Sequence, residues 1–146
     1  MNFGTGTAVA FETALGNRSA FADIVSLLGP TGATITVGTE SANAINVAIQ
    51  LTDANGADMA VRSSVRVYLS DDANGDSIAA TAPTGGIAIG TDGVLEETTA
   101  DKAGFATSES DGDIDITITD TGTPTFYLIV VLPNGKLAAS DAITFA

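Results

Sequence analysis

Apolar and polar side chains alternate along much of the chain after residue 30, which is the pattern of a β-strand with one buried face. The clearest example places Ile45, Val47, Ile49 and Leu51 on one side and small or polar residues between them. The same period predicts strands within residues 34–37, 61–69 and 113–118. Weaker patterns predict further strands at residues 87–89, 94–97, 104–107, 137–139 and 142–145.

One run departs from this alternation. Residues 126–132 read Phe-Tyr-Leu-Ile-Val-Val-Leu and are apolar throughout. A strand of this kind suits the centre of a sheet that is covered on both faces. We therefore expect residues 126–132 to form the heart of the core.

Short turn signals separate the predicted strands. Asn-Gly and Asp-Gly pairs tolerate positive φ and so close hairpins. They occur at residues 55–56, 74–75, 92–93, 111–112 and 134–135, and a Gly-Gly pair occurs at 85–86. About seven to nine short strands with turns at this spacing predict an all-β fold, an immunoglobulin-like antiparallel β-sandwich.

The first thirty residues lack this pattern, so we place a domain boundary at Gly29-Pro30. Residues 1–30 are predicted to be an N-terminal arm, and residues 31–146 the sandwich. The arm contains apolar residues at i, i+3, i+4 and i+7, which predict a short amphipathic helix after Ser19: Phe21, Ile24, Val25 and Leu28. A helix this short does not persist in water without a surface to cover.

The apolar side chains of the arm are the predicted partner-binding residues. Apolar groups outside a sandwich must either fold back onto their own domain or enter a neighbour. Both alternatives stay open from the sequence. The predicted anchors are Phe3, Phe11, Phe21, Ile24 and Leu28.

Composition removes much of the usual catalytic chemistry. The chain has no cysteine and no histidine, which excludes disulfides, thiolate nucleophiles, Cys/His zinc sites and imidazole bases. Aromatic residues make up 5% of the chain, so stacking platforms for sugars or bases are scarce. We expect no enzyme activity and no cofactor.

The formal charge of −13 comes from 18 acidic and 5 basic residues. Such a charge repels phosphate backbones and anionic lipid headgroups, so we expect neither a nucleic-acid nor a membrane partner. No segment approaches the roughly 18 consecutive apolar residues of a spanning helix. The first basic residue is Arg18, and without a basic n-region we expect no secretory signal.

Two acidic groups have alternative interpretations. Carboxylate and amide oxygens alternate in residues 71–76 as in a calcium loop. The match to an EF-hand loop is incomplete, because Gly75 precedes Asp76 and position 83 is proline where a bidentate glutamate would be needed. We therefore favour a solvated hairpin turn and predict no metal site. The second group alternates along a strand: Asp111, Asp113 and Asp115. Paired carboxylates can hydrolyse glycosides, but a row of outward charges also discourages aggregation, and we favour that simpler interpretation.

Several segments resemble bacterial immunoglobulin-like repeats. Leu51-Thr52-Asp53-Ala54-Asn55-Gly56, followed by Val61, Val65 and Val67, is similar to the turn before their third strand, and Thr91-Asp92-Gly93 and Ser110-Asp111-Gly112-Asp113-Ile114 resemble their other turns. The run from Tyr127 to Leu137 and the ending Ala142-Ile143-Thr144-Phe145-Ala146 more narrowly resemble small immunoglobulin-like virion proteins of tailed bacteriophages. The resemblance covers roughly residues 33–146. It implies a protein that decorates or cements a capsid.

Three classes of function follow, in order of preference. The first is a structural virion protein, made in the host cytoplasm and located in the virion, whose partner is the major capsid protein or another virion protein and which we expect to form a homo-oligomer. The second is a cell-surface or adhesin-type immunoglobulin-like binding module. The third is a carboxylate-based hydrolase, which lacks substrate-stacking aromatics here.

Overall fold

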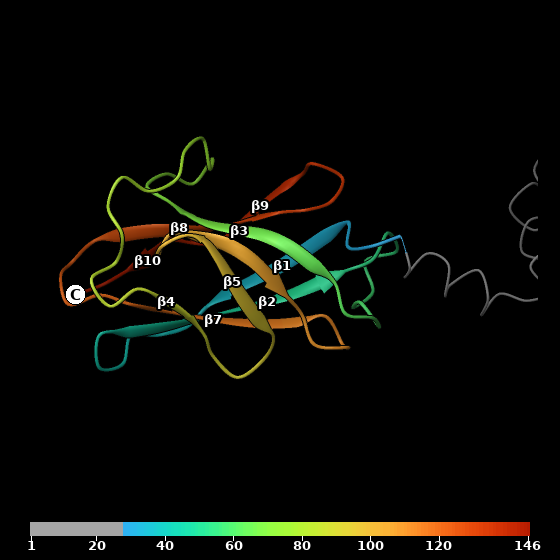
Figure 1. The fold of residues 1–146 in the computed structure, drawn as a ribbon, viewed down its shortest axis with the longest axis horizontal. Coiled ribbons are helices and arrows are strands. Elements are labelled where there is room, and N and C mark those ends of the chain that lie inside the picture. Colours follow the sequence, from blue (N-terminus) through green and yellow to red (C-terminus); the bar gives the residue numbers. More distant parts are fainter. Residues whose placement is uncertain (1–27) are drawn as a thin grey trace, which may run out of the picture.

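In the computed structural model, which describes residues 28–146, ten strands form two antiparallel sheets that face each other (Figure 1). The strands are β1 (Gly32–Val37), β2 (Ala44–Thr52), β3 (Ser64–Ser70), β4 (Ile87–Ile89), β5 (Val94–Thr99), β6 (Ala103–Thr107), β7 (Asp113–Thr119), β8 (Thr125–Val131), β9 (Leu137–Ala139) and β10 (Ile143–Thr144). The prediction of an all-β sandwich is confirmed.

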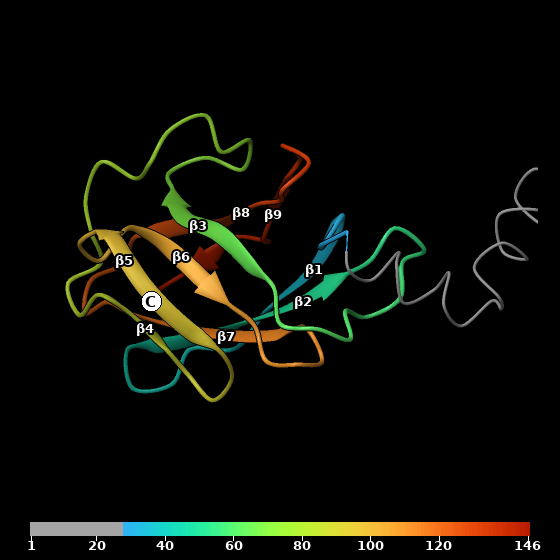
Figure 2. The ribbon, with the colours of Figure 1, turned by 45° about the vertical axis from the view of Figure 1, so that its right-hand side comes forward.

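The first sheet has the order β1-β2-β7-β4, and the second has the order β10-β8-β3-β6-β5. Strand β9 also pairs with β8, along the same edge as β10: β10 pairs with the start of β8 and β9 with its end. Figure 2 shows β3, β6 and β5 side by side in one layer, with β1, β2 and β7 in the other. Residues 28–146 contain no α-helix. Apart from residues 28–30, the predicted arm and its helix lie outside the described residues.

The core lies between the two sheets and uses the faces that alternation predicted. On β2 and β7 the inward rows are almost completely buried: Ile45, Val47, Ile49, Leu51, Ile114, Ile116 and Ile118. They pack against the inward row of the opposite sheet: Val65, Val67, Leu69, Leu128 and Val130. The turns close as their sequences predict, since Gly56, Gly75, Gly86, Gly93, Gly112 and Gly135 all have positive φ.

Tyr68 of β3 lies on the outer face, as alternation predicts, but is buried there. The alternation places it outward with Arg66, and it is only 8% exposed. The loop after β3 folds over it, and the Tyr68 hydroxyl donates to the carbonyl oxygen of Gly75 at 2.6 Å. Ile129 of β8 lies under the same loop and is fully buried, so this strand is covered on both faces as predicted.

Gly75 is what lets this loop lie so close to the sheet. Its φ is +70°, and a Cβ there would come within 3.2 Å of Ile129 side-chain atoms and within 3.0 Å of the Tyr68 hydroxyl. A side chain at residue 75 would therefore lift the loop and expose part of the outer face.

The edge of β8 changes partner at Ser140, between β9 and β10. Leu128 donates its N–H to the Ser140 Oγ at 2.9 Å, and that hydroxyl donates in turn to the Asp141 carbonyl at 2.7 Å. A buried side chain thus replaces a strand partner at the point where the chain passes from one short strand to the next.

Replacing Ser140 by alanine should leave the Leu128 N–H buried without a partner. We expect Ser140→Ala to lower the free energy of unfolding by about 1 to 3 kcal/mol, measured by urea denaturation. The matched control is Ser110→Ala in the exposed turn before β7, which should change stability by less than about 0.5 kcal/mol. Equal effects of the two variants would contradict this role for Ser140.

Candidate protein-binding surfaces

Of the five predicted anchors, only Leu28 lies within the described residues. Phe3, Phe11, Phe21 and Ile24 lie outside them. The Leu28 side chain is 71% exposed.

The chain enters the sandwich beside the turn between β8 and β9. Asn134 of this turn donates its side-chain N–H to the Thr31 carbonyl oxygen at 3.4 Å, and Thr31 donates its own N–H to the Thr52 carbonyl oxygen at 2.9 Å. Pro30 is already buried. Residues from Pro30 onward therefore contribute to the folded unit, and a truncation that spares it should end before Leu28.

Asp113 and Asp115 of β7 lie on the outer face of the first sheet, opposite the buried isoleucines, but Asp111 lies in the turn before β7 and not on the strand where the alternation placed it. Burial, and then the carboxylates of Asp111, Asp92, Asp115 and Asp58, raise the pKa of Asp113 above its usual value. Asp115 accepts a hydrogen bond from the Asn46 side chain at 3.3 Å. Three carboxylates from turns thus lie near the carboxylates of Asp113 and Asp115 on β7: Asp111, Asp92 and Asp58.

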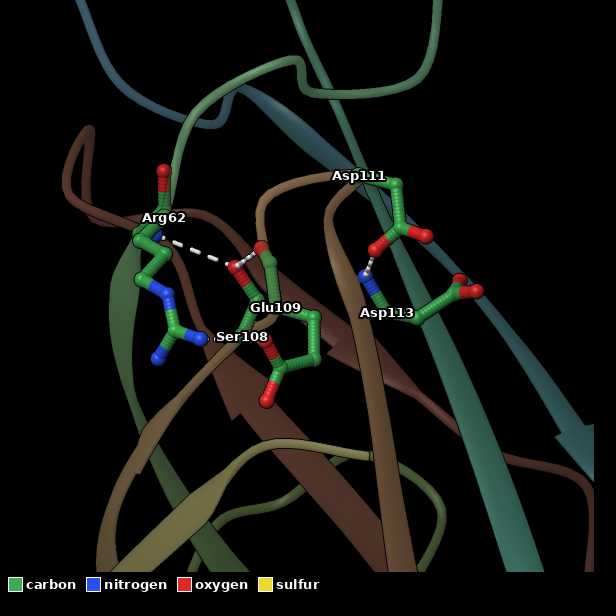
Figure 3. A network of polar contacts seen from close by, with 6 residues as sticks. Arg62, Ser108, Glu109, Asp111 and Asp113 are labelled. Atoms are coloured by element: carbon green, nitrogen blue, oxygen red, sulfur yellow. Dashed lines mark hydrogen bonds and ion pairs between the residues drawn. The ribbon is translucent and has the colours of Figure 1, made fainter. Parts of the chain in front are cut away.

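A polar network holds the turn before β7 against the segment before β3 (Figure 3). Ser63 donates its N–H to the Ser108 Oγ at 3.0 Å, and Ser108 donates its N–H to the Ser63 carbonyl oxygen at 2.9 Å. Arg62 pairs with the Glu109 carboxylate. Figure 3 shows the carboxylates of Asp111 and Asp113 on the other side of this turn from Arg62.

In the loop of residues 71–76, whose sequence is similar to a calcium loop, two aspartates use their carboxylates for main-chain contacts. Asp72 accepts the N–H groups of Asn74 and Gly75 at 2.8 and 3.0 Å, and Asp71 accepts the Ala80 N–H at 2.8 Å. Among the described residues no group of three or more acidic side chains is placed to hold a metal ion. Asp71 and Asp72 therefore hold the main chain of the loop in its conformation.

Sequence reasoning missed an exposed apolar surface on the second sheet, which we name the Phe105 face. The strand registers place five of its residues in one outward row, from β9 to β5: Leu137, Val131, Arg66, Phe105 and Glu96. Val94 of β5 adjoins them. The face lies beside the part of the sheet that the loop after β3 covers.

Three large apolar side chains are about half exposed on the Phe105 face: Val94, Phe105 and Leu137, at 52%, 48% and 49%. Arg66 lies among them, with its guanidinium carbon 5.7 Å from the centre of the Tyr68 ring. Aromatic residues and arginine are enriched in protein interfaces relative to the remaining surface. The face therefore has the composition of a protein-binding surface.

The described part of the chain contains no pocket, and none of its segments is a helix long and apolar enough to cross a membrane. No protein-family model matches the chain, and no curated protein sequence matches it. Among solved structures it is similar to a cohesin module of the family 33 glycoside hydrolase from Clostridium perfringens, at 12% identity, over 80% of this chain and 94% of that chain, with a TM-score of 0.40. A likeness this distant carries no functional inference.

Removing the charge of Asp113 should stabilise the protein at neutral pH. Because the folded protein holds this proton more tightly than the unfolded chain, the destabilising effect begins as the pH rises past the unfolded-state pKa and is complete above the raised folded-state pKa. Asp113→Asn should therefore raise the free energy of unfolding at pH 7 by a few tenths of a kcal/mol, the scale of screened like-charge neighbours. The gain should vanish below about pH 3, where the carboxyl group is protonated in both states.

Thermal melts at pH 7 and pH 3 measure this difference. Asp141→Asn, which removes the same charge from the exposed junction of β9 and β10, serves as the control and should not show this gain. A gain for Asp113→Asn that is the same at both pH values would contradict the electrostatic cause.

Metal removal should leave stability unchanged, because main-chain N–H groups already occupy oxygens of Asp71 and Asp72. We expect the same melting temperature with excess EDTA and with added calcium. A fall of more than about 5 °C in EDTA, on the order of 1 kcal/mol for a domain of this size, would instead assign an ion to the loop.

Proposed function

We propose that the chain is a structural virion protein of a tailed bacteriophage that decorates or cements the capsid through protein–protein contacts. The sandwich is the displayed body, and the apolar N-terminal segment attaches it to the major capsid protein or another virion protein. The protein is not a catalyst in this proposal.

The observation that supports the proposal most directly is that residues 30–146 supply a closed core of their own. Side chains from both sheets fill it, and within the described residues every buried side-chain nitrogen or oxygen atom has a hydrogen-bond partner. The proposal assigns Phe3, Phe11, Phe21 and Ile24 to the contact with the capsid. Leu28, at the entrance of the sandwich, is exposed.

The immunoglobulin-like part of the proposal is supported by the strand order. In immunoglobulin constant domains one sheet has the order A-B-E-D and the other C-F-G. The order β1-β2-β7-β4 corresponds to the first, and β3-β8 with β9 and β10 corresponds to the second. The hairpin of β5 and β6 is an insertion between the strands equivalent to D and E, and it widens the second sheet.

An adhesin-type binding module is the second candidate, and the Phe105 face favours it. In that case the sandwich itself contacts the partner, and the N-terminal segment is a connection. The two candidates differ in partner and in which part of the chain binds, so capsid binding by the full chain and by a truncated domain separates them.

Deleting residues 1–27 should leave a soluble domain with a cooperative thermal transition, because the described core is retained. The truncated domain should no longer sediment with phage capsids that lack this protein, whereas the full chain should. In the full chain, Phe11→Ser and Phe21→Ser should weaken this cosedimentation, since each removes a buried anchor of roughly 1.5 to 3 kcal/mol.

The control is Phe105→Ser in the full chain, which removes an apolar side chain of the sandwich and should leave capsid binding intact. If the truncated domain still sediments with capsids and Phe105→Ser does not, the capsid contact lies on the Phe105 face and attachment by the N-terminal segment is wrong. If even the full chain does not sediment with capsids, the adhesin-type candidate replaces the proposal. If the truncated domain fails to fold, the N-terminal segment belongs to the core.

A further inference from the structure

Three neighbouring residues at the β5 end of the outward row place opposite charges on the two sides of an aromatic ring: Arg66, Phe105 and Glu96. Phe105 of β6 is the direct cross-strand neighbour of Arg66 on β3 and of Glu96 on β5. Directly opposed residues of an antiparallel pair point to the same face, and adjacent strands lie about 4.8 Å apart. The row thus reads positive, aromatic, negative at equal steps across three strands.

This three-residue part of the row is complementary to itself, whereas Val131 and Leu137 lie beyond Arg66 and have no counterpart beyond Glu96. A two-fold axis that lies between two stacked copies, parallel to the strands and over Phe105, exchanges the two sides of the row. It places Arg66 of each copy over Glu96 of the other and brings the two Phe105 rings together. The alternative face-to-face axis, perpendicular to the strands, would stack arginine on arginine and glutamate on glutamate.

We propose that the Phe105 face is a homotypic docking site, through which two copies of the chain pair by an isologous contact. The two phenylalanine rings form its apolar centre, and two Arg66–Glu96 ion pairs flank them. The second copy is the occupant because the face presents both halves of its own charge pattern. This inference concerns the sandwich alone and does not depend on capsid attachment by the N-terminal segment.

The size of the contact makes the pairing weak. It spans three strands of each copy, about 10 Å between the outer strand axes, and the loop after β3 covers the neighbouring part of the sheet. A contact of this extent falls below the standard interface of about 800 Å² per partner, in the range of transient complexes. Copies arrayed on a surface would meet at high local concentration, where a weak contact is populated.

Charge reversal in the full chain tests the pairing by sedimentation velocity, at protein concentrations from about 10 µM to 1 mM. The wild type should form dimers as concentration rises, and less so at high salt. Arg66→Glu and Glu96→Arg should each weaken dimerisation by at least about tenfold, since each replaces two attractions with two repulsions. The double variant R66E/E96R should restore it, because every pair regains opposite charges.

Mixing the two single variants is the sharpest measurement. One then has a doubly negative row and the other a doubly positive row, so the mixture should form heterodimers although neither variant dimerises well alone. Asp141→Arg, at the junction of β9 and β10, is the control for charge reversal and should dimerise as the wild type does. All substituted residues are exposed, and thermal melts establish that each variant is folded.

Three results would overturn the inference: a wild type that stays monomeric up to 1 mM, a double variant that stays as weak as the single ones, or single variants that do not associate when mixed. Dimerisation that survives both charge reversals but is lost on Phe11→Ser would place self-association in the N-terminal segment instead. Retained dimerisation with lost capsid binding in that variant would leave this inference standing and separate it from the proposed function.

Discussion

The contact between the inward faces of β2 and β7 and those of β3 and β8 is the interaction on which the structure depends. Each of these central strands presents one unbroken apolar row, and stacking the two sheets removes both rows from water together. The side chains of these rows contain no polar atoms, so burying them leaves no side-chain donor or acceptor without a hydrogen-bond partner. The shorter strands β4, β9 and β10 are too small to be stable alone and depend on this central contact.

Because alternation uses one face of each strand for the core, the outer faces are free to differ. The outer face of the first sheet holds Asp113 and Asp115 among small polar residues, and burial together with the neighbouring carboxylates raises the pKa of Asp113. The outer face of the second sheet is divided. The loop after β3 covers Tyr68 and Ile129, and the neighbouring row stays exposed with apolar and oppositely charged side chains. This difference gives the sandwich one solvated side and one side suited to protein contacts.

The edges of the sheets also limit how copies can meet. β5 is an outer strand and carries Glu96 and Glu97, and its pairing with β6 shifts register near Glu97. Charges and irregular pairing discourage strand addition along this edge. Copies that meet through the second sheet therefore meet through its face, where complementary side chains set the affinity. They do not pair edge to edge through the main chain, which could add copies without limit.

The sequence by itself determined the strands, the hairpin turns and the inward rows, because the period of two and the positive φ of Asn-Gly and Asp-Gly are local properties. Leu28 stays a predicted partner-binding residue, and the structure shows it exposed. Only the tertiary structure decided that Tyr68 is buried, that Ser140 replaces a strand partner, and that Phe105 stands between opposite charges. Residues 66, 96 and 105 meet through the register of three strands, and register depends on how loops and sheets pack together, which no local pattern encodes.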